Sequence, residues 1–127
     1  MLVFMLDTEN QKTIVKDIKD ELEVFYDFIK CRCIDIPHRT IDGQPFAIIC
    51  DDEGLFNPAP IPATLVTDSE GATTIDIVGN IIIAKDGKEG ELEGLTPQDI
   101  ELIKKNIWEL ENAVTGKRIS TIHVDYN

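Results

Sequence analysis

Three consecutive carboxylates are the strongest candidate for chemistry in this sequence. Asp51, Asp52 and Glu53 stand in a row. The apolar run 46–50 precedes them and Gly54 follows. Carboxylates at the end of a buried strand can hold Mg²⁺ or Ca²⁺, which need several oxygen ligands, and a neighbouring pair can act as acid and base. The same composition is typical of a turn in which Asp caps its own backbone, and it lacks the spaced Asp ligands of a calcium loop. The turn is therefore favoured, and metal binding by these three carboxylates is the alternative.

The cysteines offer a weaker metal site. Cys31 and Cys33 are two residues apart and would share one face of a strand, with His38 as a third ligand. Structural zinc sites usually have a wider Cys spacing and a second ligand pair, which this sequence lacks. The third cysteine, Cys50, makes the number odd, which argues against a disulfide framework. We therefore expect reduced, partly buried thiols.

The familiar motifs of catalysis are missing from the sequence. It contains no serine nucleophile elbow, no phosphate-binding Gly-Lys-Ser/Thr loop and no dinucleotide fingerprint. The two histidines, His38 and His123, lie in no histidine cluster. These absences favour a protein that is not an enzyme, and we expect no cofactor.

The charge of the chain indicates which classes of binding partner it favours and which it excludes. There are 24 Asp and Glu residues against 12 Lys and Arg residues, a formal net charge of −12, and no basic residue falls between Arg39 and Lys85. Such a surface repels nucleic acid and acidic membranes and attracts basic partners. We therefore expect a protein partner with a basic surface, no direct nucleic-acid binding and no membrane binding.

Length and composition predict one small domain. The 127 residues, 43% of them hydrophobic, can bury a core without disulfides or metals. The core is expected over about 1–114, with 115–127 as an extra strand or a tail. The opening apolar run ends at Asp7, too early for a signal peptide, and no run approaches the roughly 18 apolar residues of a membrane span. These features predict a cytoplasmic protein.

The first half of the chain alternates strand and helix signals. Residues 1–6 and 13–18 are strand candidates separated by a polar turn, which predicts a hairpin. Apolar residues at helical spacing predict a helix over 20–29. A strand is expected over 31–36, and the continuous apolar run 46–50 predicts a central strand covered on both faces.

The second half carries two loops, one long strand and one long helix. The proline-rich segment 55–62 predicts a rigid surface loop, and 67–74 a mobile one. Residues 75–84 predict the strongest strand, with a bulge or the close approach of another backbone at Gly79. Thr96, Pro97 and Asp99 have the types and spacing of a helix start. The buried stripe expected for this helix is Ile100, Ile103, Ile107, Leu110 and Val114.

Together these elements predict a single α+β domain. We expect a mixed or antiparallel sheet of about five strands, with two main helices packed on one face.

Three segments resemble a family of domains of unknown function found mostly on phages, plasmids and conjugative elements. The segments are 46–54, 76–83 and 95–100. The chain departs from the family pattern at Asp51, where Asn is expected. The resemblance covers roughly residues 1–110 and implies a mobile-element context, but no activity.

Two classes of function follow, with a third as an option. The first is a small acidic protein-interaction module, an accessory or counter-defence factor that binds a basic host protein, in one version by imitating the charge of DNA. Its predicted contact residues are Asp51, Asp52, Glu53, Leu55, Phe56, Ile61, Asp68, Glu70 and Asp76. The second is a divalent-metal module or metal-dependent enzyme built on the carboxylates of 51–53. The third is a homo-oligomer, a self-associating subunit that pairs through an exposed edge strand at 119–124.

Overall fold

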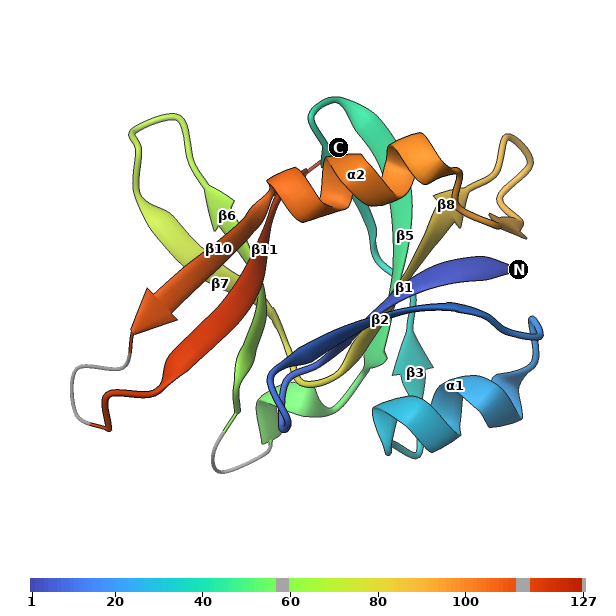
Figure 1. Ribbon diagram of the computed structural model, residues 1–127, viewed down its shortest axis with the longest axis horizontal. Helices are drawn as coiled ribbons and strands as arrows, with labels where there is room; N and C mark the ends of the chain where they lie inside the picture. The colour runs from blue at the N-terminus through green and yellow to red at the C-terminus, as the bar shows by residue number, and fades with distance from the viewer. Residues whose placement is uncertain (57–59, 112–114, 127) are drawn as a thin grey trace.

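The computed structural model describes residues 1–56, 60–111 and 115–126, which form one mixed sheet and two helices (Figure 1). The helices are α1 (Leu22–Ile29) and α2 (Pro97–Lys105), and a short 3-10 helix, η1, spans Gly54–Phe56. The strands are β1 (Leu2–Asp7), β2 (Lys12–Asp17), β3 (Ile34–Asp35), β4 (His38–Ile41), β5 (Gln44–Asp51), β6 (Pro62–Thr67), β7 (Thr73–Val78), β8 (Ile81–Asp86), β9 (Leu92–Glu93), β10 (Ile107–Glu111) and β11 (Arg118–Tyr126).

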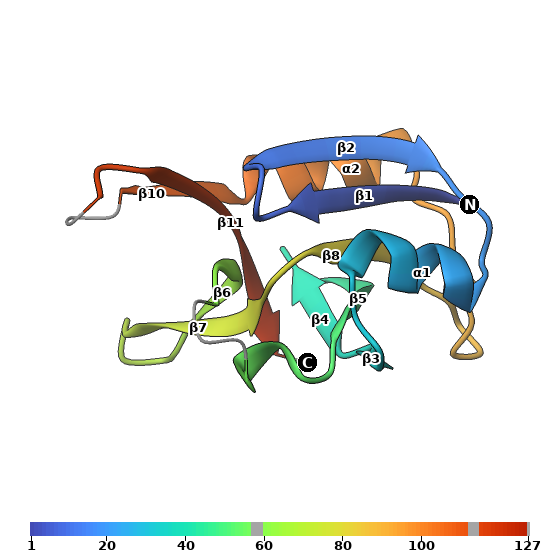
Figure 2. The ribbon, with the colours of Figure 1, turned by 90° about the horizontal axis from the view of Figure 1, so that it is seen from below.

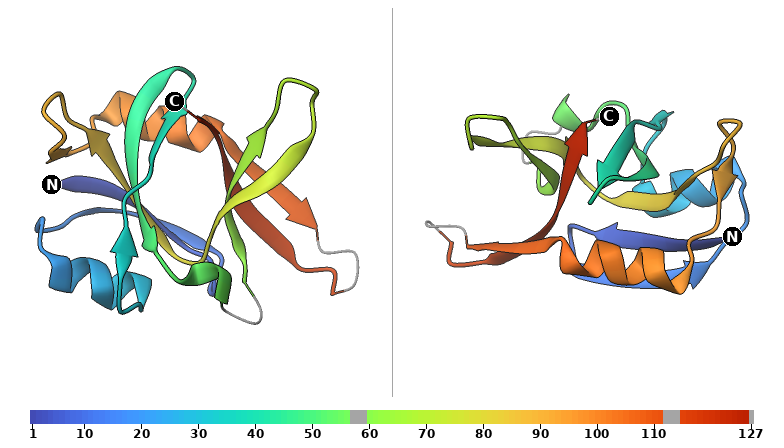
Figure 3. Two further views of the ribbon diagram at one scale, coloured as in Figure 1. Left: turned by 180° about the vertical axis from the view of Figure 1, so that it is seen from behind. Right: turned by 90° about the horizontal axis from the view of Figure 1, so that it is seen from above.

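The strands of this sheet follow the order β2-β1-β8-β5-β4-β11-β6-β7. Within the described residues, β3 pairs with β5, β9 with β8 and β10 with β11. The β11–β6 pair is parallel and the other strand pairs are antiparallel. We call β2, β1, β8, β5 and β4 the main leaf, and β10, β11, β6 and β7 the side leaf. Figure 3 shows from behind how the hairpins of the side leaf diverge from the main leaf.

The prediction of a single α+β domain is confirmed, but the expected five strands are eleven in the described part of the chain. The difference arises because β3 and β9 have two residues each and β4 has four. Strands this short show no alternation of apolar and polar residues that a sequence could reveal.

The two helices pack on opposite faces of the main leaf, so the prediction of a single covered face is wrong (Figure 2). Phe25 and Ile29 of α1 share a cluster with Val3 and Met5 of β1. Phe4 and Leu6, the alternate residues of β1, pack in the other cluster together with α2. Continuous apolar runs such as 2–6 are buried on both faces, and each face needs its own cover.

Helix α2 begins as predicted but is shorter than expected. Thr96 Oγ1 accepts a hydrogen bond from the Asp99 N–H, and Asp99 Oδ2 accepts one from the Thr96 N–H at 2.8 Å. The helix ends at Lys105, and Ile107–Glu111 forms β10 against β11 instead of a further helical turn. The strand is favoured because Asn106 O accepts a hydrogen bond from the His123 N–H at 2.8 Å, which starts the pairing with β11. Val114, predicted in the helical stripe, lies outside the described residues.

The strand predicted over 75–84 is two strands, β7 and β8, in different parts of the sheet. Gly79 lies between them with φ +83°, a conformation that glycine adopts at little cost. Asn80, which is buried, fixes the bend because its Oδ1 accepts hydrogen bonds from Thr8 N–H at 2.9 Å and Thr8 Oγ1–H at 3.0 Å. The expected bulge in one strand is therefore wrong; the glycine separates two strands.

The C-terminal segment forms β11, which lies inside the sheet. Its residues pair with β10 and β4 and, in parallel, with β6. Ile122 and Val124 are buried in the core, which therefore extends beyond residue 114. The expectation of an exposed edge at 119–124 is wrong for 122–124, which pair with β6 inside the sheet, whereas residues 119–121 pair with β10 alone among the described strands.

Several local predictions are confirmed and others are adjusted. The hairpin of β1 and β2, helix α1 and the central strand β5 lie where they were expected. The strand predicted over 31–36 is reduced to β3, Ile34–Asp35. The loop predicted over 67–74 is a tight turn between β6 and β7, in which the Asp68 N–H donates to Ala72 O at 2.9 Å. Of the predicted loop 55–62, residues 57–59 lie outside the described residues.

None of the described helices combines the length and apolar character of a membrane span.

Candidate functional site

Four of the nine predicted contact residues meet in one groove between the ends of β5 and β7. The groove has a volume of about 180 Å³. Four carboxylates line it, together with one guanidinium. We call it the acidic groove, and its lining residues are Asp35, Pro37, Arg39, Cys50, Asp51, Asp52, Gly54, Leu55, Asp76, Ile77 and Val78.

Strand pairing and one close packing contact assemble the groove. β3 pairs with β5 so that Asp35 lies opposite Cys50. Beyond β5, Gly54 of η1 packs against Val78 of β7. A Cβ atom on Gly54 would lie 3.1 Å from Val78 Cγ2 and 3.4 Å from Val78 O. The absence of a side chain at Gly54 lets η1 approach β7 and close the groove.

Asp76 forms the wall of the groove through a buried ion pair. Its Oδ1 lies 2.9 Å from Arg39 Nη2, and its Oδ2 accepts hydrogen bonds from Arg39 Nε and Thr64 Oγ1, both at 3.0 Å. The Asp76 side chain is 3% exposed. The hydrogen bonds that Arg39 donates to Asp76 raise the pKa of Arg39, whose guanidinium also lies over the Tyr126 ring at 4.8 Å. Asp76 was predicted as a surface contact, and the structure places it inside this pair.

The predicted acidic turn has the geometry of a turn. Asp51 Oδ1 accepts a hydrogen bond from the Glu53 N–H at 2.9 Å. Asp52 is exposed, and its N–H donates to Cys33 O at 3.0 Å. Glu53 lies 3.3 Å from Arg32. Asp51 and Asp52 line the groove, whereas Glu53 faces the neighbouring hollow beside Phe56.

No group of three or more His, Cys, Asp or Glu side chains is placed to hold a metal ion in the part of the chain that the structure describes. The carboxylates of 51–53 do not converge, because Glu53 turns towards Arg32. His38, the suggested ligand beside Cys31 and Cys33, lies 2.8 Å from Asp86 through its Nδ1 atom.

Cys50 lines the groove, and its pKa reflects the negative charges around it. The residue is buried, with 5% of its surface exposed. Burial, together with the nearby carboxylates of Asp35, Asp51 and Asp76, raises the pKa of Cys50 to about 12. The thiol is therefore protonated at neutral pH. Since each of these carboxylates disfavours a further negative charge, the groove favours a cation.

Two large apolar side chains stand beside the carboxylates. Leu55 and Phe56 are 77% and 83% exposed on η1. Ile61 is half-buried in a different hollow. Asp68 and Glu70 lie in the turn before β7, away from the groove. The structure therefore brings together Asp51, Asp52, Leu55 and Asp76 from the predicted contact residues.

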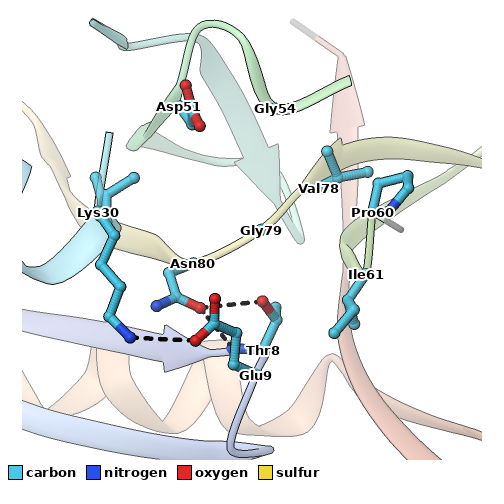
Figure 4. Close-up of a pocket in the computed structure, with 11 residues that line it drawn as sticks. Thr8, Glu9, Lys30, Asp51, Gly54, Pro60, Ile61, Val78, Gly79 and Asn80 are labelled. Atoms are coloured by element: carbon cyan, nitrogen blue, oxygen red, sulfur yellow. Dashed lines mark hydrogen bonds and ion pairs between the residues drawn. The ribbon is translucent and has the colours of Figure 1, made fainter. Parts of the chain in front are cut away.

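A second hollow, of about 140 Å³, lies on the other side of Asp51 and Gly54 (Figure 4). Figure 4 shows the side chains of Asn80 and Thr8 directed towards each other at the end of the hollow away from Asp51, and Lys30 joined to Glu9, at 3.1 Å. Asn80 bonds to Thr8 and also donates through Nδ2 to Phe28 O at 3.2 Å. The polar side chains of this hollow therefore hold separate segments of the fold together.

Sequence reasoning missed the groove residues Asp35 and Arg39 and the buried Asn80. Asn80 had a signal, because it interrupts an apolar run after a glycine. Asp35 and Arg39 had none, since their contacts depend on strand pairing with distant segments.

The comparisons with known proteins give one match. A family model described as Domain of unknown function (DUF3846) matches residues 1–108, a range that contains every residue of the acidic groove. No curated protein and no solved structure matches the chain.

Proposed function

This chain belongs to the DUF3846 family of domains of unknown function, and from its acidic groove we propose that it is a small protein-interaction module for a basic partner. In this proposal the groove takes a lysine or arginine side chain from the surface of the partner protein.

The observation that carries the proposal is the imbalance of charge in the groove. Four carboxylates line it and a single guanidinium, that of Arg39, accompanies them. Arg39 is bound to Asp76 at 2.9 Å, so among the described residues that line the groove no further cation is available to the carboxylates of Asp35, Asp51 and Asp52. A cationic side chain would gain Coulomb energy there, and the partial burial of the site increases that gain relative to an open surface.

The apolar side chains at the rim support a protein as the source of the cation. Lysine and arginine have long apolar stems, and these pack on apolar surface while the charged end binds carboxylates. Leu55 and Phe56, which are mostly exposed, offer such a surface. Exposed aromatic and aliphatic residues next to charged groups are also where interfaces concentrate their binding energy.

The mobile-element context implied by the sequence resemblance suggests what such binding would achieve. On a phage, plasmid or conjugative element, a module of this kind would act as an accessory or counter-defence factor that occupies a basic host surface. Imitation of the charge of DNA is one form of this proposal, and the net charge of −12 is consistent with it.

The test compares two variants with equal charge changes. Asp51→Asn with Asp52→Asn removes two charges from the groove, and the side-chain amide oxygen introduced at position 51 can still accept the turn hydrogen bond. Glu89→Gln with Glu101→Gln removes two charges at exposed positions outside the groove. Each protein is immobilised and used to capture partners from host lysate at low and at high salt.

We expect the wild type and the Glu89/Glu101 variant to retain a basic protein at low salt and release it at high salt, because ionic strength screens exposed charges. The Asp51/Asp52 variant should bind the same protein about tenfold more weakly, equivalent to about 1.4 kcal/mol. Equal loss in both variants, or capture that does not depend on salt, would contradict a role for the groove.

A further inference from the structure

The outer edge of β7 is the feature of this fold that the proposed function leaves unused. Among the described residues, β7 pairs with β6 alone and ends the strand order of the sheet. An edge strand presents a row of backbone donors and acceptors that another chain can pair with.

The pairing pattern shows which backbone groups face outwards. The Asp68 N–H donates to Ala72 O and the Ala72 N–H donates to Asp68 Oδ1, so the backbone groups of residues 68 and 72 face each other, as in a hydrogen-bonded pair. Hydrogen-bonded and non-hydrogen-bonded pairs alternate along an antiparallel ladder, which makes Val66 and Thr74 the next bonded pair. The backbone groups of Thr73 and Ile75 therefore point away from β6, towards the open edge. The Ile77 N–H turns inwards to Thr64 Oγ1 at 3.0 Å, where the pairing is irregular.

The other open strands of the described sheet carry charges that discourage pairing, whereas β7 does not. β2, at the opposite end, has Lys12 and Lys16, both exposed, and β10 has the exposed Glu109 and Glu111. Charged side chains of this kind are how proteins protect sheet edges. The single charged residue of β7, Asp76, is held in its ion pair with Arg39. The exposed part of β7 is Thr73, Thr74 and Ile75, which favour β structure.

The charges around β7 indicate which kind of polypeptide segment can pair with its open edge. The exposed Asp68 and Glu70 lie in the turn before the strand. At its other end, Ile77 and Val78 line the acidic groove together with Asp51 and Asp52. A strand laid along β7 would therefore have carboxylates near both of its ends. A second copy of this chain, with its net charge of −12, would be repelled, and a basic segment would be attracted.

We propose that β7 binds an extended basic segment of the partner protein as an added strand of the side leaf. The backbone of that segment pairs with Thr73 and Ile75, and a lysine or arginine at its end enters the acidic groove. This inference rests on the proposed function, because it gives the form in which the basic partner reaches the groove. Addition of a strand to a sheet edge is an established mode of peptide recognition.

The test uses a synthetic peptide of about six residues in which lysine alternates with valine or threonine. Two further versions carry N-methyl groups on alternate amides, one on each of the two alternating sets. In a strand paired on one side, one set of amides faces β7 and the other faces solvent. Binding is measured by titration calorimetry, and amide hydrogen exchange is followed at Thr73 and Ile75.

We expect the unmodified peptide and one methylated version to bind alike, and the other methylated version to bind about tenfold more weakly, since it loses its backbone hydrogen bonds to β7. Exchange at Thr73 and Ile75 should slow when the peptide binds. Ile75→Pro removes one outward N–H and should weaken binding of the unmodified peptide to a similar degree. Because proline at 75 could disturb the fold, Thr73→Pro, at the first position of the strand where proline is tolerated, is the second variant.

The alternative outcomes separate the two proposals. If all three peptides bind equally and the Asp51/Asp52 variant alone reduces binding, the groove holds a basic side chain without strand addition, and the inference is overturned while the proposed function stands. If no version of the peptide binds, strand addition is overturned and the capture experiment alone decides the proposed function. A protein that is dimeric in light scattering and becomes monomeric with Ile75→Pro would assign the edge to a second copy and overturn the basic segment.

Discussion

β7 and β8 are neighbours in the sequence, yet they have opposite positions in the fold. Each has six residues, and only Gly79 and Asn80 separate them. Residues 81–84 of β8 are fully buried between β1 and β5, whereas Thr73, Thr74 and Ile75 of β7 are exposed at the edge of the sheet. Apolar composition makes a segment a strand, while its neighbours in the sheet decide whether it belongs to the core or to a surface that can bind.

The largest effect should come from the centre of β8. Ile83→Ala removes a fully buried side chain that lies between Phe4 and Ile48 in the sheet, and such a cavity lowers the free energy of unfolding by about 4 kcal/mol. Urea denaturation measures the change. A loss below about 1 kcal/mol would mean that β8 is not the centre of the core.

Asp76→Ala tests whether β7 is held by its buried ion pair. The substitution leaves Arg39, which is largely buried, without its partner, and breaking such a pair costs about 3 kcal/mol. The same denaturation experiment applies. Asp76→Leu combined with Arg39→Met should lose less, since it removes both charges together; if the double variant is the less stable one, the pair contributes through more than its unpaired charge.

Gly79→Ala tests the bend that separates the two strands. A Cβ atom at this position meets nothing within 4 Å, so its cost is that of a left-handed backbone, about 1.5 kcal/mol. Thermal denaturation should show a lower melting temperature. Gly79→Asn is the matched control and should lose less, because Asn tolerates this conformation better; equal losses would point to crowding instead.

Low pH should weaken the ion pair that joins β8 to α2. Lys85 of β8 lies 3.1 Å from Asp99. Burial raises the pKa of Asp99, but hydrogen bonds from Thr96 and Lys85 outweigh it and hold the pKa below the ordinary value of 3.8. The unfolded chain therefore takes up this proton first as the pH falls, so the stabilisation is present above about pH 4 and is lost as the pH drops towards the folded-state pKa.

The matching variant is Asp99→Asn, which should cost about 1 kcal/mol at pH 7, the value of a helix cap, and progressively less below pH 4. Denaturation of both proteins at several pH values measures this. A difference that stays constant down to pH 2 would show that the charge of Asp99 does not contribute.

The smallest effect on stability should come from Ile75→Ala. Its side chain is 57% exposed, so the free energy of unfolding should change by less than about 0.5 kcal/mol. Compared with Ile83→Ala, this variant measures the difference between the two strands directly. A loss as large as that of Ile83→Ala would mean that the edge of β7 is covered in solution.

Sequence reasoning was most successful where the signal was local. The hairpin of β1 and β2, helix α1, strand β5 and the start of α2 at Thr96 each depend on residues within a few positions of one another. It failed at Ile107–Glu111, where the apolar spacing fits a helix but pairing with β11 gives a strand. A helical period in a short segment is overridden when a strand elsewhere in the chain offers hydrogen bonds and burial.

The candidate site was predictable in part for the same reason. The acidic turn of 51–53 and the exposed Leu55 and Phe56 follow from consecutive residues. The pairing of Asp76 with Arg39 does not, because 37 positions separate the two residues in the chain.

The charge of this protein, its main strand and helix signals and its family follow directly from the order of its amino acids. Charge is a sum over residues, and caps and turns are made by near neighbours, so neither requires knowledge of the fold. Three features become visible only in the folded chain: α1 and α2 cover opposite faces, Gly79 separates an edge strand from a core strand, and Asp35, Asp51 and Asp76 lie near Cys50. These features depend on which strands pair, and pairing minimises the free energy of the whole chain at once, so no single segment contains it.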